Sequence, residues 1–250
     1  MSSNSRKRRD RNQTADFAQN DEQGSDNLRN SPKRAKKAVD SPLSDVPSLV
    51  NAGVFNRRDR DGFTALMAFS QKGRSDLVQQ LIDLKVDLDA QHSDDGSSAL
   101  HYAALSGHVD VAAALLTAGA SRSLRNKDDW TALMTAARYG QVEVLKLFLS
   151  QSDRDLSFST KTGENALTLA ILHQHTEAVK VLLEAGALHY PQPSPLHKSI
   201  SVGSVEITRL LIEAKAYINQ GDRKERMTPL MQAVSVGNAK IVRLLLDNGA

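Results

Sequence analysis

One short motif recurs along the chain at a nearly constant interval, and this recurrence constrains the fold more than any other feature. Each copy carries a leucine that we call the anchor leucine. The anchors are Leu66, Leu100, Leu133, Leu167, Leu196 and Leu230, with separations of 34, 33, 34, 29 and 34 residues. A glycine follows five of them by seven positions, at Gly73, Gly107, Gly140, Gly203 and Gly237. A chain built from copies of one unit grows along one direction, with each unit packed on its neighbours.

The segment 94–120 is the most regular copy. Its Asp-Gly turn predicts a short helix that opens at Ser98 and ends at Gly107, because glycine readily adopts the left-handed conformation at a helix end. A second helix is predicted over Val109 to Leu116, and Gly119 stops it in the same way. Helices this short cannot bury their apolar faces alone, so each unit needs a neighbour on either side.

A turn followed by two helices, repeated about every 33 residues, resembles the ankyrin repeat. The resemblance is carried by the opening motifs Gly62–Leu66, Ala99–Ala104, Trp130–Leu133, Ser194–His197 and Thr228–Leu230. It implies an all-α fold, a solenoid of stacked helix-turn-helix units with hairpin-like fingers between them. It also implies that a partner protein lies on the concave face, formed by the fingers and the ends of the first helices.

We divide the chain into three parts. Residues 1–44 hold almost no large apolar side chain, so they are predicted to be a disordered basic tail. Residues 45–56 have the pattern of the closing half of a repeat and are interpreted as a degenerate amino-terminal cap. Six repeats are then predicted at 57–90, 91–124, 125–156, 157–187, 188–219 and 220–250.

Several repeats depart from the pattern. Gln174 stands where other units have glycine, which predicts a strained or altered turn, and Arg226 replaces a glycine in the sixth unit. The prolines between residues 191 and 195 predict a shortened finger in the fifth unit. The segment Ile241–Leu246 keeps the apolar pattern of an internal repeat, so we expect exposed apolar surface at this end and further chain after Ala250.

The amino-terminal tail is basic while the rest of the chain is nearly neutral. Residues 1–40 carry ten Lys or Arg and six Asp or Glu, a net +4 in a chain of net +3. Two compact clusters are interpreted as a nuclear-import signal for an import receptor: Arg6, Lys7, Arg8, Arg9, Lys33, Arg34, Lys36 and Lys37. The alternative is a solvated basic tail that keeps the protein soluble or touches anionic surfaces. Nucleic-acid binding is disfavoured because acidic residues are interleaved and Phe17 is the tail's one aromatic.

The sequence carries no pattern of a catalytic, cofactor or metal site. Cysteine is absent, which excludes disulfides and thiolate ligands. His101 and His197 occupy the place that resembles the family's structural histidine, and His173 and His175 are expected to diverge rather than share a metal. No nucleophile elbow and no glycine-rich phosphate loop occurs. No apolar run approaches the ~18 residues of a membrane span.

The resemblance therefore points to a binding surface. The residues predicted to contact a partner are Phe63, Trp130, Arg138, Tyr139, His173 and Met227. An exposed Trp130 beside Arg138 and Tyr139 has the composition of an interface hot spot, with packing of Trp130 on a neighbouring finger as the alternative. The predicted function is a non-catalytic scaffold or adaptor that acts at least partly in the nucleus. The alternative is the amino-terminal targeting module of a longer enzyme, such as a ubiquitin ligase, kinase or methyltransferase.

Overall fold

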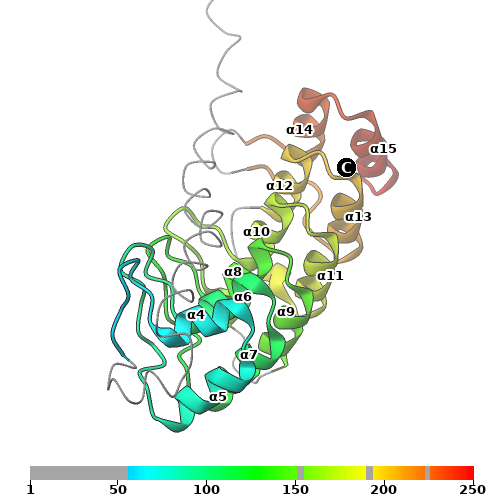
Figure 1. Cartoon of the computed structure of the whole chain (residues 1–250). Coiled ribbons are helices and arrows are strands. Elements are labelled where there is room, and N and C mark those ends of the chain that lie inside the picture. Colours follow the sequence, from blue (N-terminus) through cyan, green and yellow to red (C-terminus); the bar gives the residue numbers. More distant parts are fainter. Residues whose placement is uncertain (1–55, 151–154, 190–193, 223–225) are drawn as a thin grey trace, which may run out of the picture.

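The computed structural model describes residues 56–150, 155–189, 194–222 and 226–250. Within these ranges it contains twelve α-helices and no β-strand, and the helices form six consecutive pairs (Figure 1). The predicted all-α solenoid of helix pairs is confirmed. The basic tail, almost all of the predicted cap, and the proline-rich finger of the fifth unit lie outside the described residues.

The first helix of each pair begins next to its anchor leucine. These helices are α4 (Ala65–Lys72), α6 (Ala99–Ser106), α8 (Ala132–Arg138), α10 (Ala166–Leu172), α12 (Pro195–Ser201) and α14 (Pro229–Val236). The residue before the helix provides the start signal: the side chains of Thr64, Thr131 and Asn165 each accept a hydrogen bond from the backbone N–H three residues on. Proline opens α12 and α14, where the missing N–H costs nothing.

The second helices run antiparallel to the first. They are α5 (Ser75–Asp83), α7 (Val109–Thr117), α9 (Val142–Leu149), α11 (Thr176–Glu184), α13 (Val205–Glu213) and α15 (Ala239–Asp247). The bounds predicted for the second unit are confirmed to within one residue at each helix. Two short 3-10 turns, Asp155–Ser157 and Ala187–His189, follow the third and fourth pairs.

Each first helix packs on the first helix of the next unit, and each second helix packs on the next second helix, which gives two layers (Figure 1). The apolar side chains between the layers form one continuous core cluster from Phe63 to Leu245. The anchor leucines are buried in it, apart from Leu230, which is half-buried. Stability therefore comes from contacts between neighbouring units.

In the second, third and fourth units, the side chain eight positions after the anchor connects the unit to the preceding one through a hydrogen bond. Each donates to a backbone carbonyl of the preceding unit: His108 Nε2 to Gln71 (3.1 Å), Gln141 Nε2 to Leu105 (2.9 Å) and His175 Nε2 to Arg138 (2.8 Å). A carbonyl oxygen only accepts, so Nε2 carries the proton in both histidines. These bonds fix the spacing between adjacent units.

The recurring glycine is required by this connection. Gly140 has a φ of +65°, and a Cβ placed on it would lie 2.6 Å from Nδ1 of His175. Gln174 occupies the same position of the fourth unit with a φ of +57°, so the strain predicted there is confirmed. The neighbouring residue that would approach it is Ser204, which is short and accepts a hydrogen bond from Ile207 N at the start of α13.

The carboxyl-terminal unit exposes apolar side chains, as the sequence predicts. Met231 and Val234 on α14 are 60% and 61% exposed. The residues at the position of Met231 in other units, Met67 and Met134, are fully buried because the following first helix covers them. The open face of α14 thus has the composition of an interface between repeats.

Candidate partner-binding surface

We call the surface formed by the finger turns and the carboxyl-terminal ends of the first helices the inner face, which is where the resemblance implies that a partner lies. In the first, third and fourth units the finger is a tight turn closed by the residue seven positions before the anchor leucine. In the third unit, Asn126 Oδ1 accepts hydrogen bonds from the backbone N–H of Trp130 (2.9 Å) and of Asp128 (3.1 Å). Asp59 and Thr160 close the first and fourth fingers in the same way. The turns are therefore defined locally by side-chain-to-backbone bonds.

This turn geometry folds Trp130 inward, and the expectation that Trp130 is exposed is wrong. The side chain is 7% exposed, and the guanidinium of Arg138 lies 4.7 Å from the centre of its ring. The carbonyl of Trp130 is held by His101 Nε2 at 2.9 Å. Trp130 thus packs within the stack, which was the alternative interpretation. The group accessible to solvent at this place is Arg138 and not the indole.

Phe63 is also unsuited to direct contact with a partner. It is 3% exposed and its ring lies 4.4 Å from that of His92 and 5.2 Å from that of Tyr102, measured between centroids. The aromatic residue three positions before the anchor leucine is therefore part of the hydrophobic core in both the first and the third units. We do not retain Phe63 and Trp130 in the candidate surface.

Four of the predicted residues do reach the surface. Arg138 and Tyr139 lie at the end of α8, and His173 lies at the end of the adjacent α10. All three are half-buried, so part of each residue is accessible to a partner. Met227 is half-buried as well, but it belongs to the sixth unit and does not join this group. The centre of the candidate surface is thus Arg138, Tyr139 and His173.

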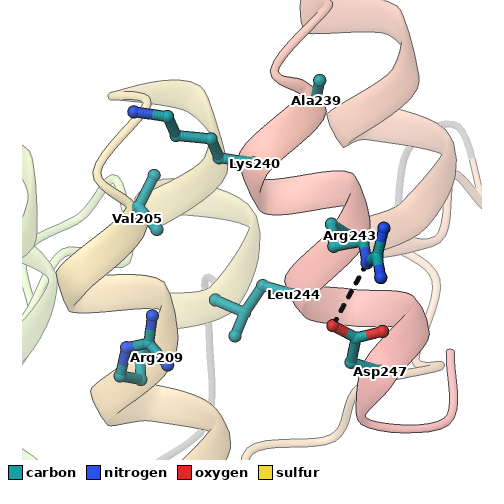
Figure 2. A pocket seen from close by; sticks show the side chains of 7 residues that line it. All are labelled: Val205, Arg209, Ala239, Lys240, Arg243, Leu244 and Asp247. Atoms are coloured by element: carbon teal, nitrogen blue, oxygen red, sulfur yellow. Dashed lines mark ion pairs between the residues drawn. The ribbon is translucent and has the colours of Figure 1, made fainter.

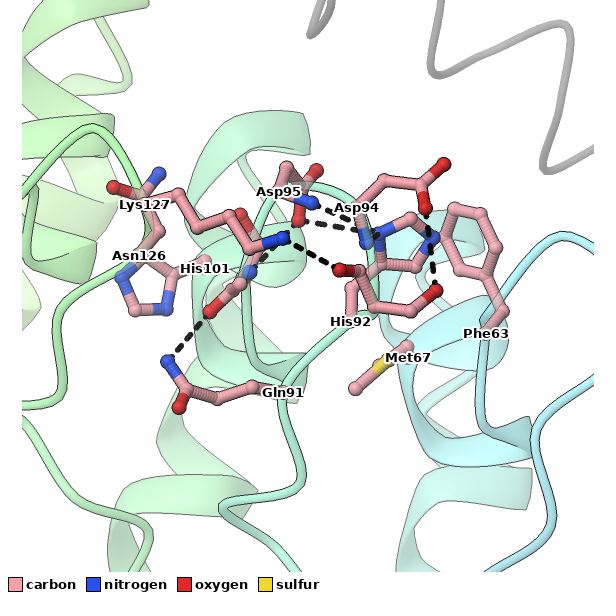
Figure 3. A network of polar contacts seen from close by, with 12 residues as sticks. Phe63, Met67, Gln91, His92, Asp94, Asp95, His101, Asn126 and Lys127 are labelled. Carbon is pink, nitrogen blue, oxygen red and sulfur yellow. Dashed lines mark hydrogen bonds and ion pairs between the residues drawn. The ribbon is translucent and has the colours of Figure 1, made fainter.

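A polar network joins the first and second fingers (Figure 3). His92 Nε2 donates to the carbonyl of Asp61 at 2.8 Å, and its Nδ1 lies 3.3 Å from Oδ1 of Asp95. The hydroxyl of Tyr102 donates to the other oxygen of Asp95 at 3.0 Å. His92 is buried, and these contacts engage both nitrogens of its ring.

Opposite effects set the pKa values in this network. Burial lowers the pKa of His92, but the hydrogen bond and charge of Asp95 outweigh it, so the pKa of His92 is raised above 6.5. Burial raises the pKa of Asp95, but the bonds from His92 and from Ser97 N outweigh it and the pKa falls below 3.8. Both shifts favour the charged pair.

Further bonds connect the second, third and fourth fingers. Lys127 donates through Nζ to the carbonyl of Ser93 at 2.7 Å and through its backbone N–H to the backbone carbonyl of Asp95 at 2.8 Å (Figure 3). Arg125 pairs with Asp129 at 2.8 Å and donates to the carbonyl of Ser159 at 3.1 Å. Four successive fingers are therefore fixed to one another, and the surface they present is preformed.

Sequence reasoning missed the charged tips of these fingers. Asp128 is exposed at the tip of the third finger. Loss of surrounding water raises the pKa of Asp128, while the nearby Arg138 acts in the opposite direction. Asp94 and Lys127 are exposed at comparable places. Their position in the sequence, between a turn-closing residue and the anchor motif, could have indicated that they lie at the finger tips.

Metal binding finds no support in the described ranges. They contain no group of three or more His, Asp or Glu side chains placed to hold a metal ion. The rings of His173 and His175 are 6.3 Å apart and inclined by 25°, so their nitrogens do not converge on one point. The predicted structural role of His101 and His197 is confirmed, because each Nε2 donates to a carbonyl of the next unit.

None of the helices in the described part of the chain has the length and apolar character needed to span a bilayer.

Comparison with solved structures places this architecture among ankyrin repeat domains. The ankyrin repeat domain of Bcl-3, a member of the IkappaB protein family, aligns over 76% of this chain and 88% of its own, with 25% identity and a TM-score of 0.68. An ankyrin repeat domain from Acinetobacter baumannii AYE aligns over 74% of this chain and 97% of its own, with 27% identity and a TM-score of 0.66.

A curated relative is "Probable E3 ubiquitin-protein ligase XBOS32" from Oryza sativa subsp. japonica. It is 36% identical over 87 residues, which cover 35% of this chain and 18% of the relative. The chain thus spans less than a fifth of the length of this relative. The family model described as "Ankyrin repeats (3 copies)" matches residues 37–126, 115–193 and 187–250. The chain belongs to the ankyrin repeat family.

Proposed function

We propose that the chain is a non-catalytic scaffold or adaptor that binds a partner protein across its inner face, centred on Arg138, Tyr139 and His173. Ankyrin repeats are protein-interaction modules, which supports binding in general. The observation that carries the assignment to this face is the set of bonds between successive fingers. A surface held rigid before binding loses little conformational entropy when a partner docks.

The chemistry of the central group favours a partner with both apolar and acidic character. Tyr139 offers an aromatic surface, and arginine and tyrosine are enriched where interfaces are strongest. Arg138 already lies against the ring of Trp130, so less side-chain freedom is lost on contact with a carboxylate. The exposed carboxylate of Asp128 lies near Arg138 and restricts where acidic residues of the partner can lie.

Capture experiments test this proposal. The tagged chain and an Arg138→Ala/Tyr139→Ala variant are used to retain proteins from a cell lysate, with quantification by mass spectrometry. Lys146→Ala on α9 is the matched control, because Lys146 is an exposed residue of the other layer. We expect one set of proteins to be retained by the wild type and the control and lost with the double variant. Equal retention by all three proteins would refute the proposal.

The alternative function is that of a targeting module within a longer enzyme. The relative from Oryza sativa supports this alternative, since it is named as a probable ubiquitin ligase and the matched segment is a small part of it. Under this alternative the inner face would select the substrate, and the catalytic group would lie outside the matched repeats.

We further propose that the basic tail directs the chain to the nucleus through an import receptor. The support is the pair of compact basic clusters at residues 6–9 and 33–37, which lie outside the described residues.

A further inference from the structure

A cleft lies in the layer of second helices, away from the fingers. It is formed between α13 and α15 and has a volume of about 550 Å³ (Figure 2). Val205, Ala239 and Leu244 provide its apolar lining. Arg209, Lys240 and Arg243 surround this lining with three cationic side chains.

The presence of Lys240 breaks a rule that the other units obey. The second residue of each preceding second helix is acidic: Asp76, Asp110, Glu143, Glu177 and Glu206. An acidic residue is favourable there because the first turn of a helix carries partial positive charge. In α15 this position holds Lys240, and the first turn has no acidic residue. The helix therefore forgoes a stabilising charge at this one place.

The substitution changes the pairing of the neighbouring cation. In α9 the acidic residue pairs with the base three positions on, Glu143 with Lys146 at 2.7 Å, and Glu206 of α13 lies 3.7 Å from Arg209. Arg243 of α15 finds Lys240 at the corresponding position and pairs instead with Asp247 at 3.5 Å. That pair is highly exposed, so it neutralises Arg243 only weakly.

We propose that the cleft between α13 and α15 binds an acidic peptide segment of a partner protein. An aliphatic side chain of the peptide would pack against Val205 and Leu244, and flanking carboxylates would face Arg209, Lys240 and Arg243. Arginine forks suit carboxylates because they donate two parallel hydrogen bonds. Asp247 repels a carboxylate at its own end of the cleft, which directs the acidic residues of the peptide toward Lys240.

The features of the cleft favour a peptide over a nucleic acid. A nucleic-acid backbone requires an extended basic path, whereas the exposed charges of α11, which packs on α13, and of α9 alternate in sign: Glu143, Lys146, Glu177, Lys180 and Glu184. The cleft also contains an acid and an apolar lining, which match an acidic peptide with a central aliphatic residue. This surface lies in the other layer from the inner face, so the two binding functions can be tested separately.

The test uses fluorescence anisotropy with a labelled peptide of sequence Asp-Glu-Leu-Leu-Asp-Glu and the whole chain. We expect saturable binding that weakens with added salt and with serine in place of both leucines. Lys240→Glu restores the acid of the other units, so the fold is retained. It should weaken binding by roughly tenfold, because it removes one exposed charge pair and adds one repulsion. Lys146→Glu is the matched control, with the same charge change on α9, and should bind as the wild type does.

Other outcomes would overturn the proposal. The first is that the peptide shows no saturable binding up to millimolar concentration. The second is that Lys240→Glu and Lys146→Glu lower the affinity equally. If the Arg138→Ala/Tyr139→Ala variant loses affinity for the peptide and Lys240→Glu does not, the peptide binds on the inner face instead. Tighter binding of a labelled single-stranded oligonucleotide, with the same sensitivity to Lys240→Glu, would assign the cleft to nucleic acid.

Discussion

The imidazole of His101 donates through Nε2 to the carbonyl oxygen of Trp130 at 2.9 Å, and thereby connects the first helix of the second unit to the finger of the third. On its other side, Nδ1 of the same ring lies 2.9 Å from the hydroxyl of Ser98. The ring is fully enclosed, and burial lowers the pKa of His101 below 6.5, which keeps it neutral. A single side chain thus fixes both the start of α6 and the position of the next finger.

Replacement of His101 by alanine is therefore expected to lower the free energy of unfolding by about 2 kcal/mol, from lost buried hydrogen bonds and an unfilled space. Urea unfolding followed by circular dichroism measures the change. Gln80→Ala, at an exposed position of α5, is the control and should change the stability by less than about 0.5 kcal/mol. A loss for His101→Ala no larger than that of the control would disprove the structural role.

The glycines between paired helices are expected to differ in their tolerance of alanine. Gly140→Ala places a methyl group 2.6 Å from the ring of His175, while the nearest atom to the corresponding methyl at Gly203 is 3.8 Å away. Both residues have positive φ, so each change costs about 1 kcal/mol from backbone strain. The contact with His175 should make Gly140→Ala destabilising by about 1 kcal/mol more than Gly203→Ala.

A double-mutant cycle isolates this steric contribution. In a His175→Ala background the clash is absent, so the cost of Gly140→Ala should fall to that of Gly203→Ala. Thermal unfolding of the four proteins in the cycle, with Gly203→Ala beside them, gives the comparison. If the cost of Gly140→Ala is unchanged by His175→Ala, the close approach of the imidazole is not the reason for glycine.

The pair His92–Asp95 should give the stability a defined pH dependence. The pKa of His92 is raised above 6.5, so its contribution is complete below pH 6.5 and is lost as the pH rises through the raised value. The pKa of Asp95 lies below 3.8, so its contribution is present above pH 3.8 and is lost as the pH falls through the lowered value. The pair therefore stabilises most between these two values.

The measurement is the difference in unfolding free energy between the wild type and Asp95→Asn across pH. We expect the largest difference between pH 3.8 and 6.5 and a smaller one at pH 8. The buried His101 titrates in the opposite sense, but it is present in both proteins and its main effect cancels from the difference. A difference that stays constant from pH 5 to pH 8 would contradict the charged pair.

Nuclear import is tested with a fluorescent fusion of the whole chain. Alanine at Lys33, Arg34, Lys36 and Lys37 should shift fluorescence from the nucleus to the cytoplasm, because an import receptor recognises the cluster by its charge. Exchange of Lys and Arg at the same four positions keeps the charge and should leave the distribution unchanged. Equal distributions of the wild type and the alanine variant would refute import by this cluster. Alanine at residues 6–9 tests the other basic cluster in the same way.

The sequence predicted the parts of this structure that depend on local signals. Helix bounds followed from Ser98, Gly107 and the anchor leucines because caps and left-handed glycines act within a few residues. The role of His101 followed from its place in the motif. The burial of Trp130 could not be predicted, because it depends on the turn closed by Asn126 and on the guanidinium of Arg138 that covers the ring.

The two surfaces differ in how far the sequence could indicate them. Arg138, Tyr139 and His173 were predicted for the inner face, but the bonds between fingers required three-dimensional positions. The charge change at Lys240 is visible once the units are aligned. Its significance emerged only from the cleft, since sequence alone does not show which side chains of α13 and α15 face one another.

The most direct test of the proposed function is site-specific photocrosslinking. A benzoylphenylalanine is placed at Tyr139 on the inner face and, in a separate protein, at Lys146 in the other layer, and each is irradiated with the proteins captured by the wild type. We predict that Tyr139→benzoylphenylalanine crosslinks a captured protein and that Arg138→Ala in the same chain abolishes the crosslink. Crosslinks to that protein from position 146 and none from position 139 would contradict binding across the inner face.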